Sequence, residues 1–328
     1  MSALDPDRYE VVPVGITRDG RWVAARRLVL DSGPTTEALP SPDLASDGDV
    51  LPAGVQSIAG AAGVTVVFPL VHGPTGEDGT IQGLLEMAEL PYVGAGVLAS
   101  ALCMDKSAAK EVLQFHRIPQ VRWRTARVDE ISAPFLDDVE SSLGYPIFVK
   151  PANLGSSIGI SRAKDRGELA AAVELAARYD DFVLLEEAVV GREIEVAVLG
   201  NDAPEASLPG EIVSSDGFYD YEEKYLNDRA KLLIPAPLSD DETAAVQHAA
   251  LQAFRALRVE GMARVDFFYD DQGRFLVNEV NTIPGFTPIS MYPKLWEASG
   301  VPSAELLDRL VALAIERCER RRAHQILR

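Results

Sequence analysis

Two carboxylates and an amide late in the chain are spaced to hold a divalent cation. Two strand-like runs flank the turn at 270–273, which predicts a β-hairpin. In that hairpin Asp266 lies opposite Glu279, and Arg264 lies opposite Asn281. Because side chains alternate along a strand, all four share one face. Carboxylate and amide oxygens suit Mg²⁺ or Mn²⁺, and a neighbouring guanidinium can stabilise an oxyanion.

The opposite face of this hairpin is expected to point into a core through Val265, Phe267, Leu276 and Val280. The alternative is a solvated hairpin face with alternating charges and an incidental ion pair. The apolar runs on both strands favour burial, and buried carboxylates without a cation would lose their hydration. A metal site is therefore the preferred interpretation.

A second chemical feature is a glycine- and serine-rich loop at 152–159, which follows Lys150. Backbone N–H groups of such a loop can cradle phosphate, and a lysine adds a positive charge beside them. The signature of P-loop nucleotide-binding proteins is absent. The run at 94–99 imitates a dinucleotide fingerprint, but no well-placed acidic residue follows about 20 positions later. The loop alone is compatible with phosphate binding and with an ordinary turn.

Segments rich in valine and isoleucine alternate with alanine- and leucine-rich helical patterns, which predicts an α/β protein. Strands are expected at 9–16, 64–70, near Tyr92, at 146–151, 182–187 and 193–199, and in the hairpin at 262–281. Helices are expected at 80–88, 105–116, 168–178, 243–257 and 303–322. A long polar loop is expected at 214–231, and a surface loop at 31–54.

The composition narrows the class of protein further. The chain has 328 residues, 47% of them hydrophobic, which is enough for two or three packed units. The net charge of −19 argues against a nucleic-acid-binding surface. No apolar run is long enough to span a membrane, and the first residues do not form a signal peptide. Cys103 and Cys318 give no disulfide framework, so a cytoplasmic protein is expected.

In their order and spacing, the motifs resemble those of the D-alanine–D-alanine ligases, which are ATP-grasp enzymes. The matching segments are 72–79, 91–106, 150–159, 218–225, 264–266, 278–285 and 290–291. The resemblance implies an α/β chain with an ATP-grasp fold, in which two α+β subdomains clasp ATP. The implied units are an incomplete Rossmann-like domain at 1–103, a small subdomain at 104–190, and a catalytic subdomain at 191–328 with a mobile loop at 214–231.

The resemblance also implies roles for individual residues. The phosphates of ATP would be bound by Lys106, Lys150 and Lys224. The adenine–ribose end would be bound by Glu186, Val189 and Glu193. Two Mg²⁺ or Mn²⁺ ions would be held by Asp266, Glu279 and Asn281. The oxyanion site would be formed by Arg264 and the backbone N–H of Gly285. The carboxylate of the second substrate would be received by Ser290 and the N–H of Met291. His72 would lie near the substrates, and a hydrogen-bonded triad closing the site would include Ser156 and Tyr225.

The implied activity joins two D-alanines through an acyl phosphate, for peptidoglycan precursors and hence for the cell wall and cell shape. Tyr225 favours D-alanine over D-lactate as acceptor, and a homodimer without nucleic-acid or membrane partners is expected. Two alternatives remain open. One is an ATP-grasp ligase for another carboxylate, and the other is a non-catalytic ATP-binding module.

The chain departs from the family's pattern at its beginning. In the family, a first strand leads to a Gly-Gly turn and to a glutamate that binds the ammonium group of the first substrate. No counterpart precedes the strand expected at 9–16. Our hypothesis is that the start codon is assigned too late, which the upstream genomic codons would test. A chain that truly begins at Met1 is expected to have poor solubility and little ligase activity.

Overall fold

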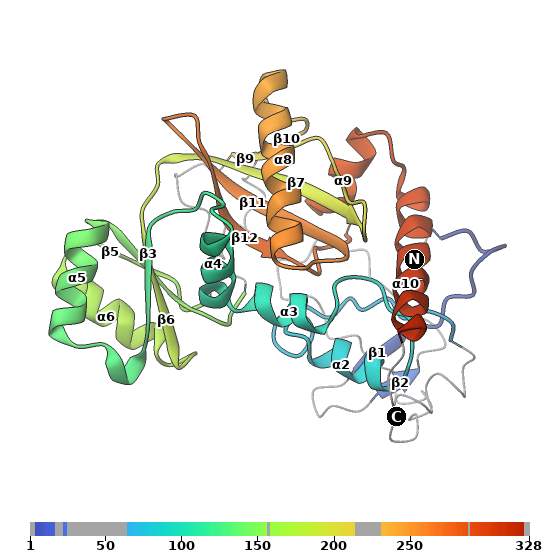
Figure 1. Cartoon of the computed structure of the whole chain (residues 1–328), viewed down its shortest axis with the longest axis horizontal. Helices are drawn as coiled ribbons and strands as arrows, with labels where there is room; N and C mark the ends of the chain where they lie inside the picture. Colours follow the sequence, from blue (N-terminus) through green and yellow to red (C-terminus); the bar gives the residue numbers. More distant parts are fainter. Residues whose placement is uncertain are drawn as a thin grey trace.

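A computed structural model describes residues 4–16, 22–24, 64–155, 158–213, 231–287 and 289–324. Its largest sheet is antiparallel and occupies the centre of the molecule (Figure 1). In spatial order its strands are β10 (Lys231–Leu233), β9 (Gly210–Val213), β7 (Gly191–Gly200), β11 (Gly261–Asp270) and β12 (Phe275–Asn281), with β8 (Glu205–Ala206) paired to β7. The long strands β7 and β11 run side by side over ten residue pairs, so they form a rigid platform.

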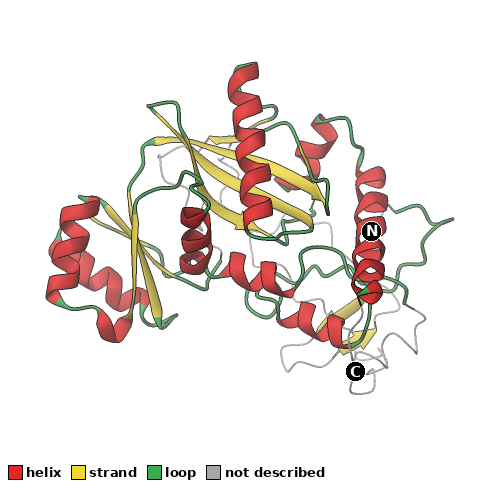
Figure 2. Cartoon of the chain, viewed as in Figure 1, coloured by secondary structure: helices red, strands yellow, loops and turns green. Residues whose placement is uncertain are grey.

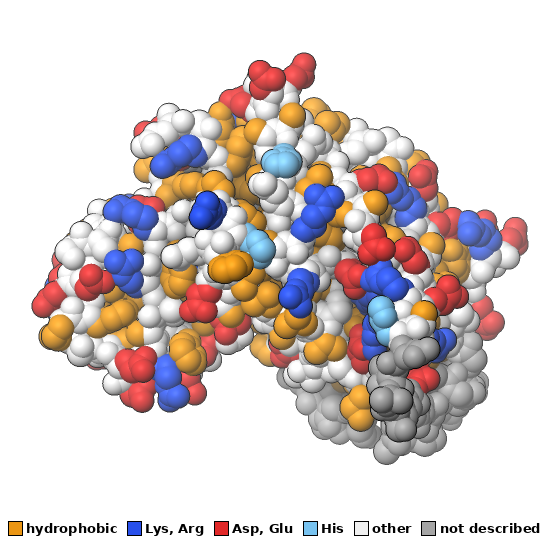
Figure 3. Space-filling view, viewed as in Figure 1, with side chains coloured by type: hydrophobic (Ala, Val, Ile, Leu, Met, Phe, Trp, Pro, Cys, Tyr) orange, Lys and Arg blue, Asp and Glu red, His pale blue; other side chains and the backbone are white. Residues whose placement is uncertain are grey.

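One face of the central sheet is covered by helices and forms the larger core. The covering helices are α3 (Val97–Met104), α4 (Lys106–Phe115) and α8 (Asp240–Ala256). Alternate strand residues such as Val196, Val265 and Phe267 pack there against Phe254 of α8. Helix α8 begins with a capping box in which Ser239 and Glu242 bond each other's backbone N–H groups. Acidic side chains gather at the projecting end of this helix, whereas basic ones are scattered over the visible face (Figure 3).

The other face of the central sheet changes character along its strands. At one end Ala197 and Met262 pack against α9 (Met291–Ala298) and α10 (Ser303–Ala323). Two residues further along each strand, the same face carries Glu195 and Arg264. This face therefore passes from a hydrophobic core to a group of charged side chains.

Helix α10 is fixed to residues 91–96 by a buried arginine. The guanidinium of Arg317 donates to the carbonyls of Tyr92, at 2.8 Å, and of Gly94, and it lies 4.3 Å from the centre of the Tyr92 ring. Burial lowers the pKa of Arg317. The contacts satisfy the polar atoms of the guanidinium and attach the last helix to the segment ahead of α3.

A second antiparallel sheet lies beside the first, as Figures 1 and 2 show. Its strands, in order, are β3 (Trp123–Arg127), β6 (Phe182–Glu187), β4 (Ile147–Pro151) and β5 (Ser161–Ala163). One face packs against α5 (Ala133–Leu143) and α6 (Arg166–Ala176) through residues that include Ile147, Val149 and Leu185. By alternation, Lys150 and Glu186 lie on the opposite face.

The described elements near the start of the chain form a small group. They are β1 (Val14–Ile16), β2 (Trp22–Ala24) and α2 (Thr80–Met87). A short 3₁₀ turn, η1 (Val128–Glu130), follows β3 at the second sheet. Helix α2 packs with Tyr92, and Val67 forms a parallel bridge with that tyrosine. None of the helices in the described ranges is long and apolar enough to cross a membrane.

Most elements expected from the sequence are confirmed, with corrections near the start. The helices and strands expected from 80 onward begin and end close to the expected residues, except that the strand expected near Tyr92 is only a bridge with Val67. The strand expected at 9–16 is confined to Val14–Ile16, and the strand expected at 64–70 is only that same bridge. Strands β2, β3, β5, β8, β9 and β10 and helices α3, α5 and α9 were not expected. Of the expected polar loop at 214–231, Lys231 belongs to β10, and the rest lies outside the described residues.

Candidate active site

The hairpin of β11 and β12 confirms the register expected near the candidate metal ligands. Asp266 pairs with Glu279, and Arg264 pairs with Asn281. Beyond Asp266 the register shifts at a β-bulge. As a result Val277, not Leu276, reaches the larger core, and the expectation that Leu276 shares the face of Val265, Phe267 and Val280 is wrong.

A third acidic residue extends the row across the sheet. Glu195 on β7 lies opposite Asp266, so Glu195, Asp266 and Glu279 follow one another across three adjacent strands. Arg264 donates Nε–H and Nη2–H to the two oxygens of Asp266, each at 2.7 Å, and its Nε lies 3.2 Å from Glu195 Oε2. Burial lowers the pKa of Arg264, but the neighbouring carboxylates outweigh it and raise the pKa well above its usual range. The guanidinium is therefore always charged.

The donor set of this hairpin fits a hard divalent cation. Asp266 and Glu279 face each other across the strands, and both can supply carboxylate oxygens as ligands. Asn281 lies one pair further along, and its Oδ1 accepts a hydrogen bond from Ile283 N at 3.1 Å, which leaves one lone pair. Each Asp266 oxygen accepts one hydrogen bond from Arg264 and keeps a further lone pair, so a cation would share this carboxylate with the guanidinium.

On the second sheet, Glu186 is held between two lysines. Its carboxylate oxygens lie 2.6 Å from Lys110 Nζ and 2.5 Å from Lys150 Nζ. Burial alone would raise the pKa of Glu186, but the two lysines outweigh it and lower the pKa to about 2. Burial also lowers the pKa of Lys110. Lys110 was not recognised in the sequence, although its position one helical turn after Lys106 was a usable signal.

Lys106 connects the glycine- and serine-rich loop to the hairpin. It is the first residue of α4, and its Nζ donates to the carbonyl of Leu154 at 2.5 Å. Burial lowers the pKa of Lys106, and the negative charge of Glu279 on β12 partly offsets this effect. Lys106 is therefore bonded to the loop and lies within electrostatic reach of Glu279 on the hairpin.

His72 reaches the same loop through Glu77. Glu77 accepts a hydrogen bond from Gly73 N at 2.6 Å, and its other oxygen lies 3.5 Å from His72 Nδ1. A Cβ atom at Gly155 would lie 3.9 Å from Glu77. Glu77 also raises the pKa of Lys106 by its negative charge. Glu77 lies in the 72–79 segment but was not predicted as a site residue.

Gly285 and Ser290 are in close contact at the start of α9. The Ser290 hydroxyl accepts a hydrogen bond from Thr287 N at 3.0 Å and lies 2.8 Å from Thr287 Oγ1. A Cβ atom at Gly285 would lie only 2.7 Å from Ser290 Oγ. The side chain of Met291 is buried in the core, so only its backbone is available to a ligand.

Under the role that the resemblance implies for Ser290, the substitution Gly285→Ala is expected to raise the KM for D-alanine more than it lowers kcat. The added methyl would push the Ser290 hydroxyl out of its contacts with Thr287. Each loss of about 1.4 kcal/mol in binding free energy would then weaken the affinity for the carboxylate about tenfold. Initial rates over a range of D-alanine concentrations would measure this. Gly83→Ala, where an added methyl meets open space, serves as the control. An unchanged KM in Gly285→Ala would contradict the assignment.

The other expected site residues are placed as follows. Val189 follows β6 and is half-buried, and Glu193 lies on β7 opposite Phe268 of β11. Ser156, Lys224 and Tyr225 lie outside the described residues. The roles expected for all of these residues stay predictions.

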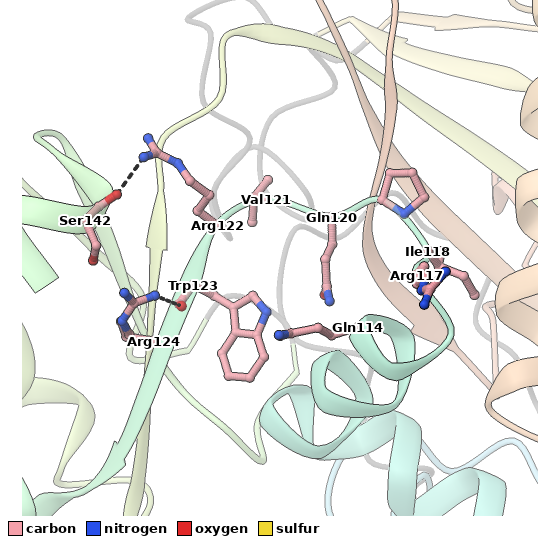
Figure 4. A pocket seen from close by; sticks show the side chains of 10 residues that line it. Gln114, Arg117, Ile118, Gln120, Val121, Arg122, Trp123, Arg124 and Ser142 are labelled. Carbon is pink, nitrogen blue, oxygen red and sulfur yellow. Dashed lines mark hydrogen bonds between the residues drawn. The ribbon is translucent and has the colours of Figure 1, made fainter.

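A cavity of about 460 Å³ lies where α4 continues into β3, and none of the expected site residues line it (Figure 4). Arg122 and Arg124 line this cavity, but both are engaged in holding the second sheet together. Arg122 donates to the Ser142 carbonyl at 2.6 Å and to Glu187, and Arg124 donates to Asp138. We assign these arginines a structural role.

The chain contains two α+β units, with lysines on one sheet and a hairpin that carries carboxylates on the other, which is consistent with an ATP-grasp fold. Family models for the C-terminal and N-terminal parts of D-ala D-ala ligase match residues 112–312 and 1–95. The chain belongs to the D-alanine–D-alanine ligase family.

Curated and solved relatives agree with this membership. The D-alanine–D-alanine ligase of Caldicellulosiruptor bescii is 47% identical over 97% of this chain and 89% of its own length. The enzyme of Geobacillus thermodenitrificans is 44% identical over the same shares. The structure of the Coxiella burnetii ligase has a TM-score of 0.79 and 37% identity, covering 98% of this chain and 88% of its own. The VanG D-Ala:D-Ser ligase from Enterococcus faecalis has a TM-score of 0.81 and 34% identity, covering 95% and 92%.

Proposed function

We propose that this chain joins two D-alanines to D-alanyl-D-alanine at the expense of ATP, supplying a peptidoglycan precursor. The observation that carries the proposal is the charged group between the sheets. There, Arg264, Asp266 and Glu279 on the hairpin share one electrostatic site with Lys106. Such a site can hold a triphosphate and neutralise charge while phosphate is transferred.

In the first step, a carboxylate oxygen of one D-alanine attacks the γ-phosphorus of ATP. The bond to the β-phosphate oxygen breaks, which gives an acyl phosphate and ADP. Lys106 and Lys150 hold the phosphates in line: Lys106 places its ammonium group against Leu154 of the 152–159 loop, and Lys150 precedes that loop with its ammonium group fixed by Glu186. Glu186 fixes Lys150, and Glu186, Val189 and Glu193 contact the adenine–ribose end.

In the second step, the amine of the other D-alanine attacks the acyl carbon and passes a proton to the departing phosphate. The tetrahedral oxyanion is stabilised by Arg264 and by the backbone N–H of Gly285, and phosphate leaves as its bond to carbon breaks. Ser290 and the N–H of Met291 receive the acceptor's carboxylate at the start of α9, where N–H groups point outward. His72 contacts the substrates from the 72–79 segment.

Asp266, Glu279 and Asn281 would hold two Mg²⁺ or Mn²⁺ ions. When bound, the ions supply positive charge to the γ-phosphoryl oxygens as ADP departs. We also propose that the subdomains begin at 104 and 191, that the protein forms a homodimer, and that it is located in the cytoplasm. They are supported by family membership rather than by a contact of this chain.

The experiment that tests the proposal is coupled ADP release by the purified chain with ATP and Mg²⁺. We expect release to require D-alanine and to stop when Mg²⁺ is chelated. L-alanine is the matched control, because it has the same groups in the opposite configuration. ATP binding without D-alanine-dependent ADP release would contradict the ligase and favour a non-catalytic module.

D-serine should be tested as a second acceptor in the same assay, because the chain is also similar to a D-Ala:D-Ser ligase. D-serine differs from D-alanine by one hydroxyl, so it is the acceptor that tests the selectivity of the site most directly. A mixture of D-alanine and D-serine with product analysis by mass spectrometry would decide between the two acceptors. We expect D-alanyl-D-alanine to dominate.

A further inference from the structure

Arg264 contacts two carboxylates, but it forms aligned hydrogen bonds with only one of them in the part of the chain that the structure describes. Asp266 accepts both of its aligned hydrogen bonds at 2.7 Å. Glu195 Oε2 lies 3.2 Å from Nε, but the hydrogen on Nε is directed at Asp266. The contact with Glu195 is therefore mainly electrostatic in this structure.

The two carboxylates also have different duties under the proposed function. Asp266 is assigned to the divalent cation, and a carboxylate shared with a cation holds a guanidinium less strongly, because the cation attracts its negative charge. Arg264 is assigned to the oxyanion, so it must stay in place when the cation binds Asp266. Two positive groups, the cation and Arg264, then lie close together and repel each other.

We propose that Glu195 is the positioning residue that keeps the Arg264 guanidinium in the site when Asp266 coordinates the cation. This inference rests on the proposed function. Glu195 attracts the Nε–H as the hold of Asp266 on it weakens, and its charge offsets the repulsion between Arg264 and the metal. It acts through Arg264 and touches neither substrate.

The surroundings of Glu195 suit this role. Its side chain is 7% exposed, so its charge is little screened by water. Strand β7 is paired on both sides at this residue, with Gly210 of β9 and Asp266 of β11. Because the backbone is held in the middle of the sheet, the carboxylate has a fixed position beside Arg264. Positioning groups of this kind typically contribute about 10- to 100-fold to activity.

The test uses Glu195→Gln, which keeps the shape of the side chain and removes its charge. We expect kcat to fall about 10- to 100-fold, with the KM values for ATP and D-alanine changed by no more than about threefold. The matched control is Glu211→Gln. Glu211 is equally buried and pairs with Arg192 at 2.8 Å, but it lies on the opposite face of the same sheet. Its kcat should stay within about threefold of the wild type.

A second readout follows Arg264 directly. In ¹⁵N-labelled protein, the Nε–H signal that disappears in Arg264→Lys belongs to this residue. With Mg²⁺ and ADP, we expect this signal to stay sharp in the wild type and to broaden in Glu195→Gln. Without metal it should be sharp in both, because Asp266 still accepts the bond. A sharp signal in Glu195→Gln at saturating Mg²⁺ would overturn the inference.

Failure of the inference and failure of the proposed function give different results. An active wild type with equal kcat in Glu195→Gln and Glu211→Gln overturns the role of Glu195 alone. A wild type without D-alanine-dependent activity overturns the proposed function. If Glu195→Gln does not fold, Glu195→Asp takes its place, because it keeps the charge but withdraws it by one methylene. A several-fold lower kcat is then expected, and an unchanged kcat overturns the inference.

Discussion

Replacing Arg264 by lysine is expected to lower kcat about 10²- to 10³-fold while the protein stays folded. The size of the loss follows from the oxyanion role, since removing one donor from such a site typically costs this much. Lysine keeps the positive charge between Asp266 and Glu195, so the buried carboxylates remain compensated. It cannot reproduce the two parallel N–H donors of a guanidinium, which fix the direction of the group.

The matched control for this substitution is Arg192→Lys. Arg192 makes the same kind of paired hydrogen bonds to Glu211, at 2.9 and 2.8 Å, on the face of the central sheet away from the site. Its kcat is expected to stay within a few-fold of the wild type. Steady-state kinetics and melting curves of both variants separate catalysis from stability. Near-normal turnover in Arg264→Lys would exclude Arg264 as the oxyanion group.

The sequence predicts those parts of the site that depend on local pattern. Alternation and the turn at 270–273 placed Asp266 opposite Glu279, because both signals act within one hairpin. The bulge after Asp266 was not predicted, because the residues around Asn278 include no glycine or other residue type that indicates a bulge. It reassigned Val277 and Leu276 to different faces.

The partners of these residues could not be predicted, because they arise from long-range pairing. Glu195 was part of a strand recognised only from its apolar residues, and nothing local indicates that β11 lies beside it. Lys110 meets Glu186 only when α4 packs against the second sheet. Strand β3 has a polar, basic sequence and becomes a strand through its pairing with β6.

The largest effect on stability is expected from Glu186→Gln. The substitution leaves Lys110 and Lys150 facing each other without the carboxylate between them, and Lys110 is only 3% exposed. Removing one member of a buried ion pair typically costs about 3–5 kcal/mol. Urea denaturation at neutral pH would measure the loss. Glu187→Gln is the adjacent control, because its partner Arg122 is largely exposed and such a pair contributes at most about 1 kcal/mol.

The same ion pair predicts a dependence of stability on pH. The pKa of Glu186 is lowered from 4.5 to about 2 in the folded protein, so the unfolded chain binds its proton first. The stabilisation by Glu186 is complete above pH 4.5 and is lost as the pH falls toward 2. Glu186→Gln should therefore show a shallower loss of stability than the wild type in this window. Parallel curves for the two proteins would show that Glu186 does not carry this charge interaction.

The double variant Lys110→Met, Glu186→Gln should lose less free energy of unfolding than the sum of the losses in the two single variants, because both changes remove the same contact. Urea denaturation of the three variants would measure this.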